Sequence, residues 1–369
     1  MRAVDHLVIG GGPAGSMLAC GLARRGRDVL VLERSSGAHH KICGEFLSWE
    51  AARILNRSGF DLAALDGAPI DRLRIVDGAR HAETRLPGTA TGISRYRLDE
   101  ALLAHAATAG AQVERGATVS ALTPQGARLS DGDLRKGARV WLATGKRDLR
   151  GHARDVDRPG ITTGLVGFKW HLTLAPADAE ALARTIELTR FSGGYAGIQP
   201  IEDWKATLCL LIERCRAAGG WPAVLAHMRS AAPALHARFV RSVPIGDRPL
   251  AIARVPYGYR RRDGLQNPFV AIGDQRAVIH SFTGDGMALA LAGGLTAAAG
   301  VDDAPTLLDR RLGRLVAGPV ARAARGYRLL SGGGLAVGAV MRVPALAGLV
   351  ARLTRVRLGH DTTVAFPQH

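Results

Sequence analysis

Three glycines near the start of the chain are spaced as in loops that bind the diphosphate of a nucleotide. Gly10, Gly12 and Gly15 give a GxGxxG pattern within the segment GGGPAG. The first glycine of such a pattern permits a tight turn from strand to helix, the second lets the backbone approach a pyrophosphate, and the third lets helix and strand pack closely. The N–H groups at the start of the following helix, near Pro13 and Ala14, would bind the anion. The spacing predicts a dinucleotide site.

The elements that must position this site form one strand–helix–strand unit. Residues 5–10 are a short apolar run that predicts a buried strand, residues 13–25 predict a helix, and residues 29–32 predict a second buried strand. Glu33 stands at the end of the second strand, where its carboxylate is placed to accept hydrogen bonds from a ribose. Arg34 beside it belongs to the same predicted site.

A second glycine-rich site far downstream distinguishes between the two common dinucleotides. It follows a short apolar strand and opens a predicted helix, and it consists of Gly273 and Asp274, then Gly284, Asp285, Gly286 and Met287. Asp274 is placed to bind the ribityl hydroxyls of a flavin. The N–H groups at the helix start would face the electron-rich edge of a reduced isoalloxazine. NAD alone needs no such second clamp, so the two sites together predict FAD.

These motifs resemble those of the flavoprotein family that contains para-hydroxybenzoate hydroxylase and geranylgeranyl reductase. The likeness rests on GGGPAG with Glu33, on Arg95-x-x-Leu98-Asp99 at a helix start, and on GD followed by TGDGM. It covers about residues 3–300. The resemblance implies an α/β fold in which a Rossmann-like FAD-binding domain is interleaved with a mixed β-sheet substrate domain, with the flavin at their junction. It also implies that Arg95 lies near the FAD phosphates or ribityl chain, and that Val119 presents its backbone to the adenine.

Two segments depart from the hydroxylase pattern. Hydroxylases of this family carry an acid in the stretch that matches Ala143, Thr144 and Gly145, and here Thr144 replaces it. We include these three residues in the predicted FAD site, with NADH or NADPH as a candidate reductant and a separate flavin reductase as the alternative. The loop at residues 41–45 resembles the Cys-Gly segment of geranylgeranyl reductases, which adds Cys43 and Gly44 to the predicted site.

Two side chains are candidate catalytic residues. The Cys43 thiol would face the isoalloxazine if its loop runs beside the flavin; the alternative is a small thiol packed beside a glycine turn. His280 is a candidate for donating a proton or positioning substrate, and the alternative is a surface or capping histidine. The small residues at 193–197 resemble the family's strand on the substrate side of the flavin and would leave room for a bulky ligand.

The two predicted domains interleave along the chain. Alternating polarity and an Asp-Gly turn at residues 77–78 predict a hairpin, and residues 162–254 read as a separate lobe of strands and helices. We assign the FAD-binding domain to residues 1–70, 95–161 and 255–300, the substrate domain to 71–94 and 162–254, and a helical C-terminal region to 301–369.

Composition excludes several protein classes. The chain has 369 residues, 47% apolar and 22% charged, so it can bury enough surface to fold. The four cysteines form no CxxC pair, and we expect neither a disulfide framework nor a metal site. The net charge of +17 comes from arginines scattered along the sequence. A nucleic-acid binder would gather them on one face, and we expect no nucleic-acid partner.

We expect a cytoplasmic protein, because the N-terminus lacks the apolar run and cleavage site of a signal peptide. The apolar blocks between residues 329 and 351 are interrupted by glycines, Arg342 and Pro344, which argues against a membrane span. Packed helices are the expected structure there, and peripheral contact with a membrane is the alternative.

The sequence favours an FAD-dependent oxidoreductase acting on a hydrophobic small molecule. The leading interpretation is a flavin monooxygenase that oxygenates an aromatic or polyketide-like compound of secondary metabolism. The alternative is a geranylgeranyl-reductase-like enzyme that reduces C=C bonds of a polyprenyl or lipid substrate. A hypothesis of another class is a non-catalytic, redox-responsive flavin-binding protein.

Overall fold

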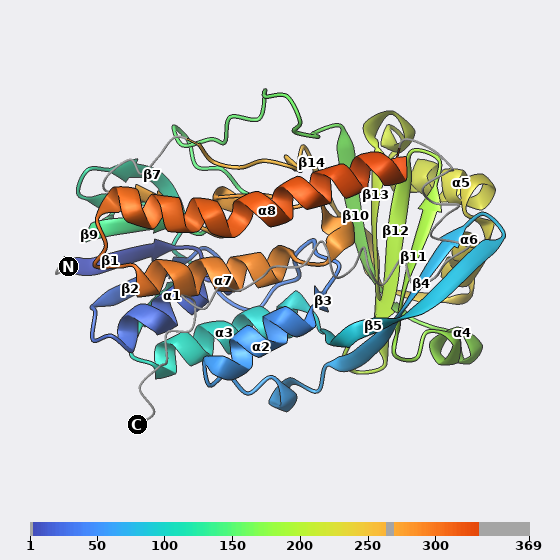
Figure 1. Ribbon diagram of the computed structural model, residues 1–369, viewed down its shortest axis with the longest axis horizontal. Coiled ribbons are helices and arrows are strands. Elements are labelled where there is room, and N and C mark those ends of the chain that lie inside the picture. Colours follow the sequence, from blue (N-terminus) through green and yellow to red (C-terminus); the bar gives the residue numbers. More distant parts are fainter. Residues whose placement is uncertain (1–2, 263–268, 332–369) are drawn as a thin grey trace.

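Two β-sheets stand side by side, each with its own set of helices (Figure 1). The computed structural model describes residues 3–262 and 269–331. One sheet, with α1, α3, α7 and α8 around it, is built around the first glycine motif, and the other carries α4, α5 and α6 on its far side (Figure 1). The α/β fold with a mixed second sheet is confirmed.

The first sheet is parallel where it carries the glycine motif. Its spatial order is β6 (Gln112–Arg115), β2 (Val29–Glu33), β1 (Val4–Ile9), β9 (Leu134–Leu142), β8 (Gly126–Leu129) and β7 (Val119–Thr123), and β15 (Phe269–Ala271) pairs with the end of β9. Strand β1 is parallel to both β2 and β9. Their carboxyl ends therefore meet at one edge, where parallel α/β sheets bind ligands.

Small residues bring the two helices of the glycine motifs close together. Helix α1 (Pro13–Ala23) packs along α7 (Gly286–Ala299). A Cβ added to Gly294 would lie 2.6 Å from the carbonyl oxygen of Ala14, and one on Gly21 would lie 2.6 Å from the Cβ of Ala298. Only glycine permits this approach, which places both helix starts beside the same edge of the sheet.

Two further helices complete this half. Helix α2 (Trp49–Arg57) follows Ser48, whose side chain accepts a hydrogen bond from the Ala51 N–H. Helix α3 (Arg95–Thr108) begins directly after Ser94, because Ser94 caps it by accepting from the Arg97 N–H. This start puts Arg95 on the first turn of α3.

The second sheet is mostly antiparallel and draws on distant parts of the chain. Its order is β14 (Val243–Ala253), β10 (Leu165–Thr173), β13 (Lys205–Glu213), β12 (Gly194–Pro200), β11 (Thr185–Phe191), β4 (Ala68–Asp77), β5 (Arg80–Gly92) and β3 (Phe46–Leu47). Only the pair β4 and β11 is parallel among the described pairs of this sheet. Helices α4 (Pro176–Ala181), α5 (Gly220–Ala231) and α6 (Pro233–Arg241) cover it.

Strand β14 is an element that the sequence pattern did not predict. It contains Pro244, Gly246 and Pro249, residues that weaken a strand prediction. The structure places it at the sheet edge with an irregularity in its pairing to β10 between Lys169 and His171. Edge strands and bulges tolerate proline, because the missing N–H faces away from the ladder.

Helix α8 (Pro305–Ser331) runs from the first sheet toward the second (Figure 1). It is the described part of the C-terminal region that we expected to be helical. The remaining residues of that region, with most of the apolar blocks considered for membrane contact, lie outside the described residues. None of the helices in the described part of the chain has the length and apolar character needed to cross a membrane.

Candidate functional site

A groove of about 450 Å³ runs along the carboxyl edge of the first sheet. Most of the residues predicted to bind FAD line it, although they come from separated segments. These residues are Gly10, Gly12, Pro13, Ala14, Glu33, Arg34, Cys43, Arg95, Val119, Ala143, Thr144, Gly145, Gly273, Asp274, Gly286 and Met287.

The first glycine motif forms a turn that admits no side chains. Gly10 has a φ of +108°, and an added Cβ would lie 2.5 Å from the carbonyl oxygen of Ala143. A Cβ on Gly15 would lie 1.9 Å from the carbonyl oxygen of Gly10, so Gly15 packs beneath the turn. Gly12 faces the groove at the N-cap of α1, where no side chain caps the helix. Uncapped N–H groups beside a glycine fit an anionic diphosphate.

Glu33 closes the other side of this turn. Its two carboxylate oxygens accept hydrogen bonds from the N–H groups of Gly11, at 2.8 Å, and Ser35, at 3.0 Å. Burial raises the pKa of Glu33, but these two donors outweigh burial and the pKa falls below its usual value. The carboxylate is therefore charged and fixed in position, and each oxygen can accept a further hydrogen bond from a ribose.

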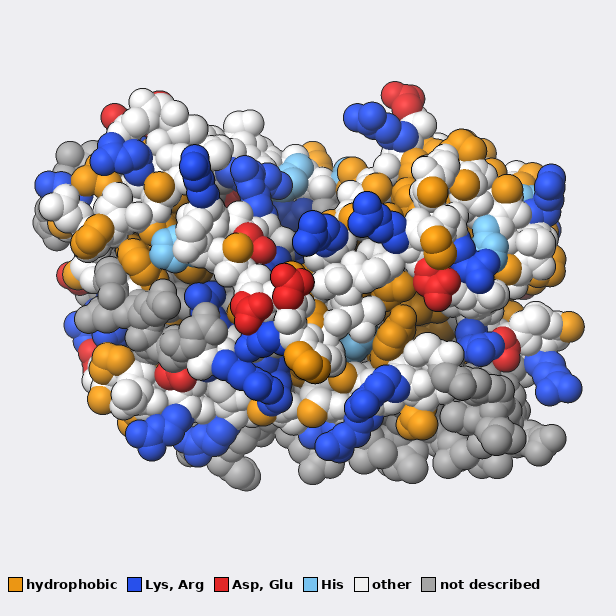
Figure 2. Space-filling view, turned by 90° about the horizontal axis from the view of Figure 1, so that it is seen from above, with side chains coloured by type: hydrophobic (Ala, Val, Ile, Leu, Met, Phe, Trp, Pro, Cys, Tyr) orange, Lys and Arg blue, Asp and Glu red, His pale blue; other side chains and the backbone are white. Residues whose placement is uncertain are grey.

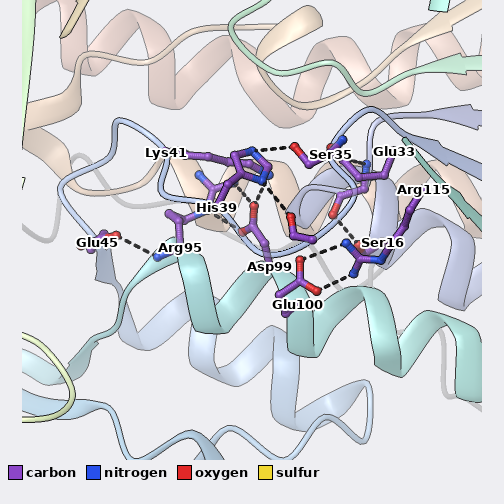
Figure 3. A network of polar contacts seen from close by, with 12 residues as sticks. Ser16, Glu33, Ser35, His39, Lys41, Glu45, Arg95, Asp99, Glu100 and Arg115 are labelled. Carbon is purple, nitrogen blue, oxygen red and sulfur yellow. Dashed lines mark hydrogen bonds and ion pairs between the residues drawn. The ribbon is translucent and has the colours of Figure 1, made fainter. Parts of the chain in front are cut away.

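Arg95 is held against the groove by a buried acid (Figure 3). Its guanidinium donates two hydrogen bonds to Asp99, at 2.6 and 2.7 Å, and the Lys41 ammonium donates to the same carboxylate at 2.6 Å. Burial raises the pKa of Asp99, while Arg95 and Lys41 lower it more strongly. The guanidinium lies close to Gly12, since a Cβ added there would be 3.6 Å from Nη2 of Arg95. Two cations thus flank the place where the diphosphate would lie.

The second glycine motif completes the far end of the groove. Asp274 accepts a hydrogen bond from the Lys146 ammonium at 3.2 Å, and both side chains line the groove. Asp274 raises the pKa of Lys146, so the lysine stays charged. Gly284 has a φ of +72°, and a Cβ there would lie 2.6 Å from the ring of Phe46.

One predicted residue of this motif lies outside the groove lining. Asp285 was predicted to bind the cofactor, yet its side chain is completely buried and lines neither this groove nor the neighbouring cavity. It is the N-cap residue of α7, and its N–H donates to the Thr283 hydroxyl. Gly286 and Met287, the next two residues, do line the groove.

These residues fit FAD. The groove offers an uncapped helix start with two neighbouring cations for a diphosphate, a fixed carboxylate for a ribose, and an Asp–Lys pair at the other end. Val119, predicted to face the adenine, lies in the lining next to Ala117 and Thr118. Residues 250–252 of β14 form part of the wall, which the sequence did not indicate.

A second, apolar cavity of about 300 Å³ opens against the face of the second sheet. It shares part of its lining with the groove, namely Ile42, Cys43, Lys146, Asp274, Gly286 and Met287. Aliphatic side chains such as Leu73, Ile186 and Leu210 form much of its wall, and Gly326 and Leu329 of α8 cover one side. A ligand in this cavity would lie next to whatever occupies the adjoining end of the groove.

A buried charge cluster joins the two sheets beside this cavity. Glu45, which has a φ of 57°, contacts the Lys169 ammonium and lies 2.6 Å from Nε2 of His171. Burial raises the pKa of Glu45, and the contacts with His171 and Lys169 lower it below its usual value. The Arg95 N–H also donates to Glu45 at 2.8 Å. The cluster therefore ties loop 41–45 to strand β10 and to the start of α3.

The same cluster contains three potential metal ligands, although no metal site was expected. Ligand atoms of His40, Glu45 and His171 lie within 4.8 Å of one another. Lys169 already pairs with Glu45, and its positive charge opposes a bound cation. The contacts favour an ion-pair role for this group.

The two catalytic candidates lie in different environments. Cys43 lines both the groove and the cavity, and its sulfur accepts a hydrogen bond from the Glu45 N–H at 3.4 Å. His280 lines neither, because its ring stacks between Tyr257, at 5.5 Å, and Tyr327, at 4.4 Å. Burial lowers the pKa of His280 to about 4. These contacts indicate a packing role for His280, and the catalytic role considered from the sequence stays a prediction.

Sequence reasoning missed several residues that shape the two spaces. Lys41 and Lys146 lie two residues and one residue, respectively, from predicted positions, and their positive charge near a predicted diphosphate site was the available signal. No signal in the sequence pointed to Glu45 or Gln199. Their place beside the cavity depends on how strands β10, β12 and β13 pair, and the local sequence does not reveal that pairing.

Comparison with known proteins gives the same picture of the first half of the chain. Residues 3–135 match the family model described as an FAD binding domain. A menaquinone reductase of Mycobacterium tuberculosis is 27% identical over 219 residues, which are 55% of this chain and 54% of that protein. Protein FixC of Escherichia coli is 30% identical over 165 residues, 39% of this chain and 37% of that protein. The chain spans about half the length, or less, of these curated relatives.

Solved structures match almost the whole fold at low sequence identity. A flavin-dependent brominase superposes with a TM-score of 0.78 and 19% identity, covering 96% of this chain and 93% of that one. A flavoprotein/dehydrogenase from Cytophaga hutchinsonii gives 0.77 and 16%, covering 96% and 92%. A myxobacterial FAD-dependent halogenase gives 0.74 and 16%, covering 99% and 96%. The flavoprotein resemblance and the FAD cofactor inferred from the sequence are confirmed.

Proposed function

We propose that the chain is an FAD-dependent oxidoreductase that reduces a C=C bond of a hydrophobic substrate, because residues 3–135 match the family model described as an FAD binding domain. The substrate class is a polyprenyl or lipid-like molecule. The relatives named menaquinone reductase support reduction over oxygenation, and the apolar cavity supports a hydrophobic substrate.

One observation carries the proposal: Cys43 lies where the groove and the apolar cavity meet. Reduced FAD supplies a hydride equivalent when it is bound. Reduction of a C=C bond also needs a proton on the other carbon, from an acid at the same junction. Lys146 and Asp274 are there too, but they pair with each other at 3.2 Å. Among the described residues that line both the groove and the cavity, the Cys43 thiol is the remaining proton donor, and solvent reprotonates the thiolate after each turnover.

Other residues of the cavity hold the substrate and exclude water. The Tyr195 hydroxyl and Ser281 hydroxyl are 2.6 Å apart. The pKa of Tyr257 is raised to about 12, mainly by burial, so this phenol in the cavity lining stays neutral. Aliphatic walls and neutral polar groups suit a ligand that carries no charge.

A product analysis with and without oxygen tests the proposal. Holoenzyme reduced by dithionite under anaerobic conditions is mixed with geranylgeraniol, and the product is examined by mass spectrometry. We expect a product that has gained two hydrogens without O2. Failure to form it, or a requirement for O2, would contradict reduction.

Two cysteine variants test the role of Cys43. Replacing it by serine (C43S) should lower turnover by about 100-fold at unchanged FAD content, because a general acid contributes on this order. Cys209→Ser is the matched control, since Cys209 lines the same cavity and mainly burial raises its pKa to about 12. Equal turnover in C43S and C209S would exclude Cys43 as the proton donor.

Monooxygenation is the second candidate, favoured by the apolar wall of the cavity beside the groove. Such a wall would exclude water from a flavin-dependent reaction with O2. Monooxygenation predicts that phenols from a test panel gain one oxygen atom, and only when O2 is present. Parallel assays with NADH, NADPH and an added flavin reductase identify the reductant.

A further inference from the structure

Gln199 is a buried amide in the wall of the apolar cavity. It lies on β12, its residue is 1% exposed, and it lines the cavity together with Tyr195 and Gly197. Residues two apart on a strand face the same side, so the Gln199 side chain points to the cavity face of the sheet. Neither Oε1 nor Nε2 has a hydrogen-bond partner among the described residues.

The neighbouring polar groups differ from Gln199 because they pair with one another. Glu45 contacts Lys169 and His171, Lys146 contacts Asp274, and Tyr195 contacts Ser281. Thr207 is the register partner of Gln199 on β13, yet its hydroxyl is likewise without a partner in the described structure. The sheet around Gln199 therefore supplies no group that satisfies the amide.

A buried amide without a partner is unfavourable, and most such groups in folded proteins are hydrogen-bonded. A primary amide can donate and accept at the same time, without carrying charge. Its complement is a neutral oxygen group such as a ring hydroxyl or carbonyl. The apolar residues nearby, among them Ile186 and Leu73, would contact the hydrocarbon part of the same ligand.

We propose that Gln199 determines substrate specificity by hydrogen-bonding a hydroxyl or carbonyl oxygen at the head of an otherwise apolar substrate. This inference rests on the proposed function, in which the cavity holds the substrate next to the flavin. It narrows the substrate class from any hydrophobic compound to one with an oxygen-bearing end.

Binding of two probes that differ by one hydroxyl tests this role. Oxidised holoenzyme is titrated with 1-naphthol and with naphthalene, and the change in the flavin absorbance spectrum reports occupancy of the cavity. We expect the natural chain to bind 1-naphthol more tightly than naphthalene. The Gln199→Leu variant should lose about tenfold in 1-naphthol affinity and keep its naphthalene affinity, since it lacks only the amide.

The control variant is Thr189→Val. Thr189 is also buried with a hydroxyl lacking a partner among the described residues, but it lies on β11 outside the cavity lining. T189V should bind both probes as the natural chain does. Thermal unfolding without probe adds a second readout, because Q199L should be at least as stable as the natural chain if the amide serves a ligand.

The outcomes separate the two proposals. An unchanged preference for 1-naphthol in Q199L, or a loss of stability without a change in preference, would overturn the role of Gln199 even if geranylgeraniol is still reduced. Binding of neither probe to the natural chain would also overturn it. Correct probe selectivity with no anaerobic reduction product would leave the specificity role standing and reject the proposed reaction.

Discussion

The groove and the apolar cavity adjoin each other but are built in different ways. The groove is formed by backbone turns at the ends of parallel strands, with glycines at Gly10, Gly12 and Gly273 and fixed charges at Glu33 and Asp99. The cavity is formed by side chains on one face of the mostly antiparallel second sheet, including the parallel pair β4 and β11. Backbone geometry therefore determines which ligand fits the groove, whereas the identity of the side chains determines which ligand fits the cavity.

Cofactor binding and ligand preference should therefore respond to substitutions in different places. Substitutions in the groove should change cofactor binding and fold together, because the turn and the strand ends are one structure. Substitutions in the cavity wall should change ligand preference with little effect on cofactor. Basic side chains are dispersed over the face seen in Figure 2 and do not form a single patch there.

The largest effect is expected from Gly15→Ala. The added Cβ would lie 1.9 Å from a backbone oxygen of Gly10, so the turn must open. We expect FAD affinity to fall by more than about 100-fold and unfolding free energy to fall by more than about 4 kcal/mol. FAD fluorescence titration and thermal melts measure both. Gly37→Ala, where a Cβ meets nothing within 4 Å, should change neither, and equal behaviour of the two variants would break the comparison.

The second largest effect is expected in the buried charge cluster of Glu45, Lys169 and His171. Lys169→Met leaves the carboxylate of Glu45 buried without its ammonium partner, which should cost about 4 kcal/mol of unfolding free energy. Chemical denaturation measures the loss. The double variant that adds Glu45→Gln should recover part of it, because the isolated charge is gone. If the double variant were no more stable than the single one, the cluster would not act as an ion pair.

A pH-dependent effect separates packing from catalysis at His280. Its pKa falls from 6.5 to about 4 on burial, so the folded state favours the neutral ring. As the pH falls, the unfolded chain binds a proton at His280 before the folded chain does. The stability that the neutral, buried ring contributes is therefore complete above pH 6.5 and is lost between pH 6.5 and about 4. His280→Phe should reduce the loss of stability over that window by up to about 3 kcal/mol.

Melting temperatures of the natural chain and H280F from pH 4 to 7 test this account. His81→Gln, at an exposed position in the β4–β5 hairpin, controls for loss of a surface histidine. A full pH dependence in H280F, or turnover abolished at neutral pH with stability intact, would contradict a packing role for this ring.

The smallest effect is expected at the start of α3. Ser94→Ala removes the side chain that accepts from the Arg97 N–H, and should cost about 1 kcal/mol. Urea denaturation measures this cost. Because Arg95 and Asp99 lie on the same helix, FAD affinity should fall slightly as well. A loss of FAD affinity larger than that of G15A would reverse the order of the comparison.

Much of the groove could be predicted because its motifs are local in sequence. A glycine turn, its helix and the acid at the next strand end occupy one continuous segment, so spacing alone places Gly12 and Glu33. The burial of the Asp285 side chain was not visible in the sequence, because it depends on how α7 packs. A role for Asp285 in FAD binding stays a prediction. His280 was likewise buried by tyrosines from distant segments.

The cavity was mostly hidden from sequence reasoning because its residues meet only through the sheet. Gln199, Lys169 and Glu45 come from three separated segments, and their proximity depends on strand register. Strand β14, with two prolines, lacks the alternating pattern that reveals other strands. The proposed domain boundaries remain a prediction, as do the reductant and the cellular compartment.

Titration of the flavin-free chain with FAD measures whether the groove binds a whole dinucleotide. We expect one FAD to bind per chain with quenching of flavin fluorescence, and affinity for FMN to be at least about 100-fold weaker because FMN lacks the adenosine half that the groove holds. Absence of FAD binding, or equal affinity for FMN and FAD, would contradict this expectation.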